Sequence, residues 1–337
     1  MKKSALLVVW GDISLCRRAQ RRYADLVNSG FNVSWLCNSQ ENDTGASAFI
    51  AYKSKSIPWK IYSFLLLLLG FYSSYARTFR LISLVAEDFD LVVCYDLVLI
   101  PLVRKRIKFS ELEIDVREYY SKQFEDDIIW KITFGRYYRY LMRHELPSAD
   151  FIKTVSPGLV AALGKDFDVK AELSPSYSDF IGPPAQPKNT SYKLMHHGVA
   201  NKNRNIELYF KVISLLPHQF ELDLFLVETD ARYMKRIRKL ATSESRVRII
   251  EGLDYSEVSE HFNRYDIGLF LTRAVTFNLD QSWPNKVFDY LSQGMWVVAT
   301  PLAGIRDLAR QHGNIRLTDD CSPQAIASTI LSCYETK

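Results

Sequence analysis

The sequence predicts an α/β protein of two doubly wound domains, each a parallel sheet with helices on both faces. Apolar runs of strand length alternate with helical segments along its 337 residues, a pattern typical of parallel sheets. The stretch 175–189 holds four prolines and separates two series of such runs. Proline density of this kind cannot continue a helix or a central strand, so this stretch is interpreted as a linker. The length also fits two domains of about 150 residues each.

The first domain is expected to open on a strand at 5–10, which Gly11 and Asp12 end. Its six apolar residues are fewer than the 7–15 or so of a secretion signal, so a buried strand is the better interpretation. A helix at 17–28 should follow and end at Gly30. Further strands of this domain are expected at 31–37, 91–94, 113–116 and 151–155.

The second domain shows the same alternation. Its strands are expected at 192–197, 222–227, 247–250, 266–271 and 296–299. We therefore place the domains at 1–180 and 191–337 with a linker at 181–190, and the last helix either stays in its own domain or packs back on the first. Ligands of such folds bind beyond the carboxyl ends of the strands, here expected to face each other across a cleft that closes during the reaction.

Composition narrows the function. Hydrophobic residues make up 47% and charged residues 24%, with only 14 Gly and 12 Pro, which excludes a disordered, collagen-like or coiled-coil chain. The net charge of +5 is too small to indicate nucleic acid as a partner. The sequence has no G-x-G-x-x-G, Walker A, HExxH or G-x-S-x-G motif and no cluster of metal ligands. We expect no metal and no cofactor, and a reaction in which the protein mainly positions groups and neutralises charge.

The cysteines indicate the compartment. Their number is odd and their spacing scattered, which favours reduced, mostly buried thiols and a cytosolic protein. They are Cys16, Cys37, Cys94, Cys321 and Cys333.

The segment 282–304 carries the most chemical information. Pro284 suits the first position of a helix, with Ser282 or Trp283 as its cap and Gly294 as its end. The free N–H groups of such a helix start can bind a phosphate. Lys286 lies in the first turn, where a cation is unfavourable unless an anion binds nearby. Asp289, one turn further on, is placed to accept hydrogen bonds from sugar hydroxyls.

The run PNKVFDYLSQGMWVVATP in this segment resembles the nucleotide-binding segment of family 4 glycosyltransferases, which have the GT-B fold. In that family a carboxylate holds the ribose of a nucleotide sugar, and Asp289 stands where Glu is usual. Gln281 stands where many members have a second Glu, which weakens any role for it but matches a sub-pattern with P-x-K. The resemblance implies a nucleotide-sugar donor, retention of anomeric configuration and no metal requirement.

The stretch YKLMHHGVANKNR at Tyr192–Arg204 resembles the family's first strand of the second domain and its basic phosphate-binding loop. Gly198 would let the backbone approach a ligand, and Lys202 or Arg204 would neutralise a diphosphate. The turn at 226–230 (LVETD) lacks the family's glycines, which leaves recognition of the base open. The predicted donor site comprises Gly198, Lys202, Arg204, Pro284, Asn285, Lys286, Asp289 and Gly304.

Two blocks of the first domain also match. The sequence TVS at 154–156 matches the family's segment before the linker, and DVRE at 115–118 resembles its D-x-H-E motif. Arg117 replaces the histidine of that motif, so no catalytic histidine is transferred. We expect the acceptor near Gly11, Asp12, Asp115 and Glu118, and name Glu118, Arg204 and Lys286 as the catalytic candidates.

Each candidate also has a structural interpretation, and these alternatives stay open. Asp289, Lys286 and Arg204 could be solvated charges, and Glu118 could pair with Arg117 or a neighbour. Asp12 could cap the helix that follows it. Both His196 and His197 are more typical of strand residues with satisfied ring nitrogens. The four arginines at 17, 18, 21 and 22 form one basic helix face, either solvated or anion-binding.

The sixteen residues between Lys60 and Arg77 contain no charge. They are too few to span a membrane, which takes about 20 apolar residues. They form either a buried helix or an interfacial helix that rests on anionic lipid through the flanking Lys53, Lys55, Lys60, Arg77 and Arg80. The region 53–108 has nine basic and four acidic residues, and thus the same +5 as the whole chain.

Together these features predict a glycosyltransferase that moves a sugar from a nucleotide sugar, UDP- or GDP-linked, to a glycan or lipid-linked glycan. Surface polysaccharide biosynthesis is the expected role, in the cytoplasm or peripherally on the membrane's cytoplasmic face. Two alternatives remain: a non-catalytic GT-B protein that binds a sugar nucleotide or a partner, and a nucleotide-sugar epimerase of the same architecture.

Overall fold

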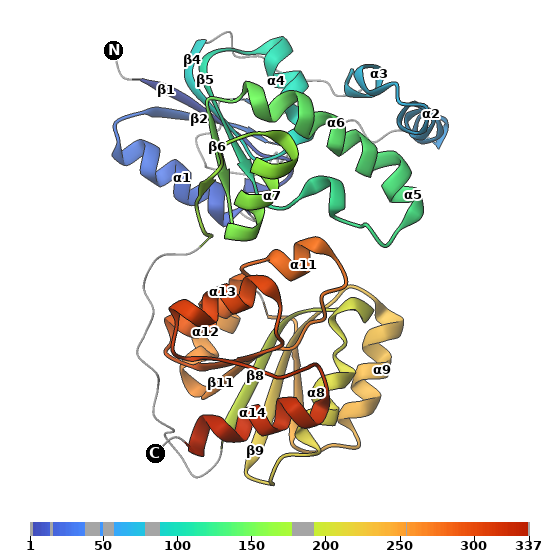
Figure 1. The fold of residues 1–337 in the computed structure, drawn as a ribbon, viewed down its shortest axis with the longest axis vertical. Helices are drawn as coiled ribbons and strands as arrows, with labels where there is room; N and C mark the ends of the chain where they lie inside the picture. The colour runs from blue at the N-terminus through green and yellow to red at the C-terminus, as the bar shows by residue number, and fades with distance from the viewer. Residues whose placement is uncertain are drawn as a thin grey trace. The chain divides into compact units, whose positions relative to one another are not determined.

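The computed structural model describes residues 3–13, 16–37, 48–49, 57–77, 88–176, 192–253 and 255–335 (Figure 1). The linker predicted at 181–190 and the basic residues Lys53, Lys55 and Arg80 lie outside this part. The chain divides into two compact units. One comprises Met1–Ser176 with Thr276–Asn278, and the other Tyr177–Val275 with Leu279–Lys337.

The first unit is built on a seven-stranded parallel sheet of order β3-β2-β1-β4-β5-β6-β7. Its strands are β1 (Ser4–Val8), β2 (Asn32–Cys37), β3 (Ala48–Phe49), β4 (Asp88–Cys94), β5 (Lys108–Val116), β6 (Phe151–Thr154) and β7 (Glu172–Leu173). The helices are α1 (Arg17–Asn28), α2 (Ile57–Leu68), α3 (Tyr72–Ala76), α4 (Ile100–Arg106), α5 (Ile128–Trp130), α6 (Arg136–Glu145) and α7 (Pro157–Phe167), with a π-helical turn, η4 (Lys131–Gly135), between α5 and α6.

The central strand β1 shows why its sequence is a continuous apolar run. It pairs with β2 on one side and β4 on the other. Leu6 and Val8 pack in one core cluster, while Ala5 and Leu7 pack in another. Side chains alternate across a strand, so both faces of the sheet are covered and every position of β1 is apolar.

The second unit has a six-stranded parallel sheet of order β10-β9-β8-β11-β12-β13. Its strands are β8 (Tyr192–Ala200), β9 (Phe220–Glu228), β10 (Val247–Glu251), β11 (Ile267–Phe270), β12 (Trp296–Ala299) and β13 (Ile315–Leu317). The helical segments are η6 (Lys202–Arg204), α8 (Glu207–Ile213), α9 (Ala231–Ala241), α10 (Tyr255–His261), α11 (Phe277–Gln281), α12 (Asn285–Ser292), α13 (Ala303–Gln311) and α14 (Pro323–Glu335).

Both faces of the second sheet are covered as well. Leu222, Leu224 and Leu226 of β9 pack in one cluster, and Phe225 packs in the other. The last helix, α14, contributes buried Ile326 and Ile330 to the first of these clusters. The prediction of two doubly wound parallel sheets is confirmed.

The uncharged stretch between Lys60 and Arg77 forms α2 and α3. Leu66 and Leu67 are buried, whereas Ile61, Leu65 and Leu69 are exposed. The segment is therefore neither a fully buried helix nor a free one: one stripe packs on the unit and the other faces outward. In the part of the chain that the structure describes, no helix has the length and apolarity needed to cross a bilayer.

Candidate functional site

The carboxyl end of β8 and the start of α12 bring two predicted donor residues together. The Nζ atom of Lys286 donates a hydrogen bond to the backbone carbonyl of His197 at 2.6 Å. Gly198 has φ +139°, and a Cβ atom at this position would collide with Lys286 Nζ. Only glycine combines this backbone conformation with this approach. The glycine thus makes room for the ammonium group at the end of the strand.

Arg204, the last residue of η6, follows β8 and lies close enough to Lys286 to act on its charge. It is partly buried, and desolvation lowers its pKa. Desolvation, helped by the Arg204 charge, lowers the pKa of Lys286 to about 7, against a smaller opposite effect of Asp289. Among the described residues neither Arg204 nor Lys286 has an ion-pair partner. Two neighbouring, partly buried cations with no carboxylate in ion-pair contact among the described residues form a site suited to an anion.

Asp289 and His197 face each other beside this cation pair. His197 Nε2 lies 3.4 Å from Asp289 Oδ2, and the His197 N–H donates to Tyr290 Oη at 3.3 Å. Burial lowers the pKa of His197, with the carboxylate of Asp289 opposing, so the ring is neutral at neutral pH. Asp289 is only 5% exposed, so the alternative of a solvated charge is wrong.

His196 has the structural role that its strand position predicts. Its Nδ1 atom contacts the Leu269 carbonyl at 3.0 Å and Tyr209 Oη at 2.8 Å. The residue is buried, and desolvation holds its pKa well below the usual value. A neutral ring fixed in the core is no candidate for proton transfer.

The start of α12 differs by one residue from the prediction. Pro284 is the cap residue, in extended conformation, and the helix begins at Asn285, which is exposed. Neither Ser282 nor Trp283 is the cap: the Ser282 hydroxyl donates to the Leu279 carbonyl and Trp283 is buried.

Close packing explains why residue 304 is a glycine, which the sequence did not reveal. A Cβ atom there would lie 2.9 Å from the carbonyl carbon and oxygen of Gln281. The first N–H group of α13, that of Ala303, already donates to Asp280 Oδ1 at 3.0 Å. Asp280, 23 residues earlier in the chain, therefore satisfies the first N–H group of this helix, whose cap residue in sequence is Leu302. Nothing local in the sequence signals this contact.

The remaining predicted positions of the second unit lie on its surface. Lys202 is exposed. In the LVETD turn, β9 runs on to Glu228, and Asp230 Oδ1 caps α9 by accepting from the N–H groups of Arg232 and Tyr233. The turn's acidic residue thus serves the helix.

In the first unit, polar groups gather at the carboxyl ends of β1, β4 and β5. Asp115 is buried and pairs with Arg18 Nε at 2.6 Å, and burial raises its pKa to about 6 despite that arginine. Glu118 is partly buried and accepts from Gln123 Nε2 at 2.8 Å. Burial raises its pKa too, with Arg117 opposing. These carboxyl groups are held in place rather than solvated.

Asp96 was missed by the sequence analysis. Its two oxygens accept from the Trp10 N–H at 2.7 Å and from Arg117 Nη2 at 2.8 Å. Arg117 therefore pairs with Asp96 and not with Glu118. The available signal was a polar residue two positions after the apolar run of β4, at the strand end where ligands bind.

Gly11 and Asp12 follow β1 at this same end. Gly11 has φ +105° with free space around its Cα atom, and Asp12 is exposed. The cap position of α1 is Cys16 rather than Asp12.

At least two arginines of the basic face of α1 bind partners within the unit. Arg18 pairs with Asp115, and Arg22 Nη2 lies 2.5 Å from Glu113 Oε2. Arg17 and Arg21 are exposed. The face is thus neither wholly solvated nor an open anion site, since two of its four guanidinium groups bind buried carboxylates of β5.

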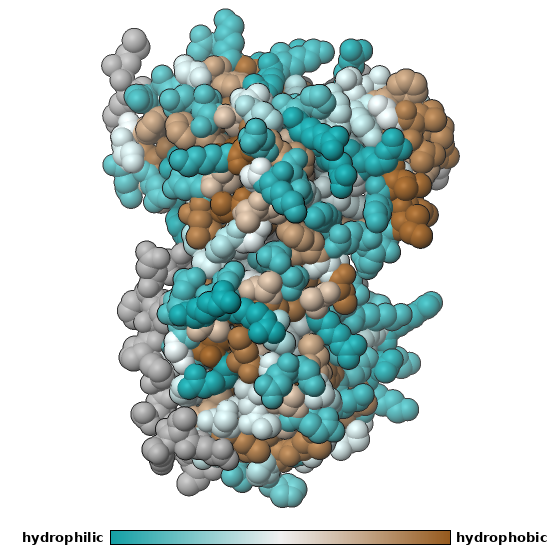
Figure 2. Space-filling model, in the orientation of Figure 1, coloured by the Kyte–Doolittle hydropathy of each residue, from teal (hydrophilic) through white to brown (hydrophobic). Residues whose placement is uncertain are grey.

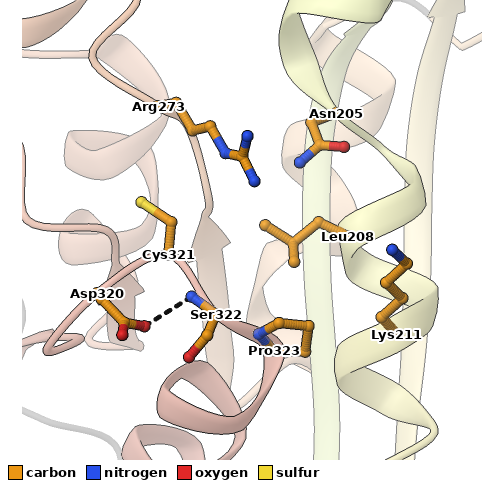
Figure 3. A pocket seen from close by; sticks show the side chains of 8 residues that line it. All are labelled: Asn205, Leu208, Lys211, Arg273, Asp320, Cys321, Ser322 and Pro323. Carbon is orange, nitrogen blue, oxygen red and sulfur yellow. Dashed lines mark hydrogen bonds between the residues drawn. The ribbon is translucent and has the colours of Figure 1, made fainter.

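The second unit also contains a cavity of about 410 Å³ beside η6 (Figure 3). Arg273 and Asn205 point into it, and Asp320 turns aside to accept from the Ser322 N–H at 2.7 Å. The full lining is Asn205, Leu208, Lys211, Arg273, Asp320, Cys321, Ser322 and Pro323. None of the predicted donor residues lines this cavity. Within the described ranges, no group of three or more His, Cys, Asp or Glu side chains could hold a metal ion.

Comparison with known proteins identifies the second unit. Residues 191–336 match the family described as "Glycosyl transferases group 1". The second unit is a glycosyltransferase domain. Taken with the two-sheet architecture, this makes the chain a glycosyltransferase of the GT-B type. No curated protein sequence matches the chain.

Solved structures of low sequence identity share the fold of this glycosyltransferase. Sucrose-phosphate synthase from Thermosynechococcus elongatus matches with a TM-score of 0.70 at 13% identity, covering 99% of this chain and 90% of that one. HepE of Anabaena in complex with UDP and glucose matches with 0.65 at 12% identity and the same two coverages. TarM of S. aureus, in a complex containing UDP, matches with 0.57 at 12% identity, covering 73% of this chain and 48% of that one.

Proposed function

We propose that this glycosyltransferase takes its sugar from a nucleotide sugar and transfers it to a glycan or lipid-linked glycan, with retention of configuration. A role in surface polysaccharide biosynthesis, in the cytoplasm or on the cytoplasmic face of a membrane, completes the proposal. Support comes from the family of the second unit, from its anion site, and from the sequence resemblance to retaining family 4 enzymes.

The cation pair Arg204 and Lys286 is the observation that carries this proposal. A donor's diphosphate gains negative charge as it leaves the sugar, and cations already held in position stabilise such a leaving group without reorganisation. Gly198 leaves room for the Lys286 ammonium group at the end of β8. The site neutralises charge with the chain's own side chains.

Asp289 would hold a hydroxyl group of the nucleotide or sugar. Its carboxylate lies next to the neutral ring of His197, so it keeps acceptor capacity for a donor ligand. UDP is the first nucleotide to test, because HepE and TarM were both crystallised with it.

The first unit would bind the acceptor. Glu118 and Asp96 lie at the carboxyl ends of β5 and β4, and burial raises the pKa of both. A carboxyl group of raised pKa exchanges protons closer to neutral pH than an ordinary one, which suits a contact with an acceptor hydroxyl. We assign Glu118 and Asp96 to orienting that hydroxyl.

A thermal-shift screen against UDP, GDP, ADP, CMP and their sugar derivatives tests the donor site. A ligand at a hundred times its Kd stabilises the protein by about 2.7 kcal/mol, which is readily seen. We expect a clear shift with one nucleotide, lost in Arg204→Ala and Asp289→Ala variants that remain folded. If no nucleotide shifts the melting temperature, the donor site is wrong.

An NMR time course with the binding nucleotide sugar then separates the activities. Transfer to an added glycan acceptor with an unchanged anomeric configuration supports the proposal. Conversion of the donor with no acceptor present would indicate an epimerase, and binding without turnover over a broad acceptor panel would indicate a non-catalytic protein.

A further inference from the structure

Exposed apolar side chains gather at one end of the first unit. Figure 2 shows them as a brown area at the right-hand edge, where Figure 1 places α2 and α5. Ile128 is 75% exposed, Leu69 65% and Ile129 62%. The complete set is Ile61, Tyr62, Phe64, Leu65, Leu69, Phe71, Phe124, Ile128, Ile129, Ile132 and Phe134, which we call the apolar end. Contiguous apolar patches larger than a few hundred Å² are rare on soluble proteins and usually mark an interaction site.

Packing joins the two segments of the apolar end into one surface. α2 packs against η4, and α3 continues the same contact. The Tyr75 ring meets the edge of Phe134 at 6.3 Å, and the Tyr72 ring lies 5.5 Å from Tyr137 and 5.0 Å from Tyr140 of α6. The α2–α3 pair is thus fixed on η4 and α6 by its inner aromatic rings while its outer leucines face outward.

Two segments of the apolar end carry charges of one sign only. The segments 57–77 and 128–144 contain six Lys or Arg and no Asp or Glu. Lys131, Arg136, Arg139 and Arg143 are exposed, and none of them forms an ion pair within the described part of the chain. Three acidic residues, Glu125, Asp126 and Asp127, lie between Phe124 and Ile128 of the apolar end. Glu125 accepts from the Phe277 N–H group and Asp127 caps α5, and Asp126 is exposed.

We infer that the apolar end and its flanking cations dock on the surface of an anionic phospholipid bilayer. The apolar side chains can enter the boundary between headgroups and acyl chains, and the unpaired cations beside them can contact the anionic headgroups. A second copy of the chain matches poorly, because a twofold contact through the same patch would bring like charges together. The purpose of this docking rests on the proposed function: it would hold the enzyme where a lipid-linked acceptor lies.

This surface differs from the one that the sequence suggested. Of the basic flank predicted around 53–108, Lys53, Lys55 and Arg80 lie outside the described residues and Arg77 is exposed; the exposed arginines of α6 add to it. Residues 124–134 were not recognised as part of the patch, because a helix of isoleucine and aromatic residues is indistinguishable in sequence from a buried one.

Sedimentation with vesicles tests the inference. The full chain is mixed with vesicles of 30% phosphatidylglycerol in phosphatidylcholine, or of phosphatidylcholine alone, and the bound fraction is measured. We expect binding to the anionic vesicles that is at least tenfold weaker without phosphatidylglycerol. Leu65→Ser with Leu69→Ser, and Ile128→Ser with Ile129→Ser, should each weaken it at least tenfold, and Arg136→Gln with Arg139→Gln and Arg143→Gln should abolish the preference for anionic lipid.

Matched variants control for exposure and charge. Val27→Ser with Leu215→Ser removes two apolar side chains that are also exposed, 43% and 46%, outside the apolar end. Arg232→Gln with Lys235→Gln and Lys239→Gln removes three exposed cations of α9. Both should bind vesicles as the wild type does.

Three results would overturn the inference: no vesicle binding by the wild type, equal binding by patch and control variants, or a wild-type dimer in light scattering that the patch variants convert to monomer. Nucleotide binding, measured in parallel, separates this inference from the proposed function. If the wild type binds nucleotide but not vesicles, the membrane surface is refuted and the donor site is not. If the wild type binds vesicles but no nucleotide, the donor site is refuted and the membrane surface is not.

Discussion

Replacing Lys286 by Met tests the donor site most directly. The change removes the ammonium group and keeps an unbranched apolar side chain of similar length. A hydrogen bond to a charged group contributes about 1.5–3 kcal/mol, which corresponds to a roughly tenfold to 150-fold weaker nucleotide-sugar affinity. The fold should survive, because Lys286 makes one hydrogen bond, to a backbone carbonyl, and no ion pair within the described residues.

The pH dependence makes the same test sharper. Burial and the nearby Arg204 lower the pKa of Lys286 from 10.5 to about 7. Below pH 7 the free protein carries the ammonium form, whereas above pH 7 a proton must be taken up before the diphosphate gains that cation. The Kd should therefore rise about tenfold for each pH unit above about 7, until the pKa of Lys286 in the complex is reached.

Isothermal titration with the preferred nucleotide sugar at pH 6, 7, 8 and 9 measures this slope. A nucleotide sugar is preferable to a free nucleotide diphosphate, because its phosphates do not titrate in this range. His197 does not contribute, since its pKa is lowered from 6.5 and its ring is neutral throughout the upper range. Lys211→Met, which removes an exposed lysine of α8 in the same unit, serves as the control.

The reasoning is refuted by a wild-type Kd that stays constant from pH 7 to 9. It is also refuted by a Lys286→Met variant that binds within threefold of the wild type and keeps the same slope. The Lys211→Met variant should keep both the affinity and the slope.

Three further changes test neighbouring features. Gly198→Ala should destabilise the fold by about 1–3 kcal/mol, because φ is +139° at this position, and should weaken nucleotide binding at least tenfold by displacing Lys286. Gly30→Ala, at a position with φ +87° and free space around it, should change stability alone. Urea unfolding measures the stability of both variants, and titration calorimetry measures their nucleotide binding. Arg204→Ala should raise the nucleotide Kd at least tenfold and leave the urea midpoint within error, and a normal Kd would remove it from the site. Asp280→Ala should lower the free energy of unfolding by about 1 kcal/mol, because the first N–H group of α13 loses its side-chain acceptor; a loss below about 0.3 kcal/mol would show that this hydrogen bond contributes little.

The sequence predicted the sheets well, because buried parallel strands are short apolar runs. Helix α1 begins and ends at the predicted residues. The polar ends of strands were underestimated: β5 begins at Lys108 rather than at 113, since its first residues alternate in polarity. The short edge strand β13, Ile315–Leu317, holds an arginine and was not predicted at all. Edge strands are specified by their neighbours more than by their own residues.

The sequence analysis named candidate residues but not the partners that the structure gives them. The arginines of α1 form one helix face in sequence, but nothing local shows that Arg18 and Arg22 meet carboxylates 97 and 91 residues away. The Gly198 contact with Lys286 joins residues 88 positions apart through the β8–β11 crossover. The spacing of residues within one helix or strand can be read from the sequence. Contacts between residues of different elements depend on the register of the sheet.

The difference between these two groups of cations is itself an argument about function. Arg18 and Arg22 are partly buried and each binds a buried carboxylate, so they stabilise the free protein. Lys286 occupies the first turn of α12, next to a second cation and with a lowered pKa, and each of these features is unfavourable in the free protein. A cation held where the fold gains nothing from its charge is expected where a ligand supplies the missing anion. For that reason we propose Lys286 and Arg204 for the donor site, and a structural role for the paired arginines of α1.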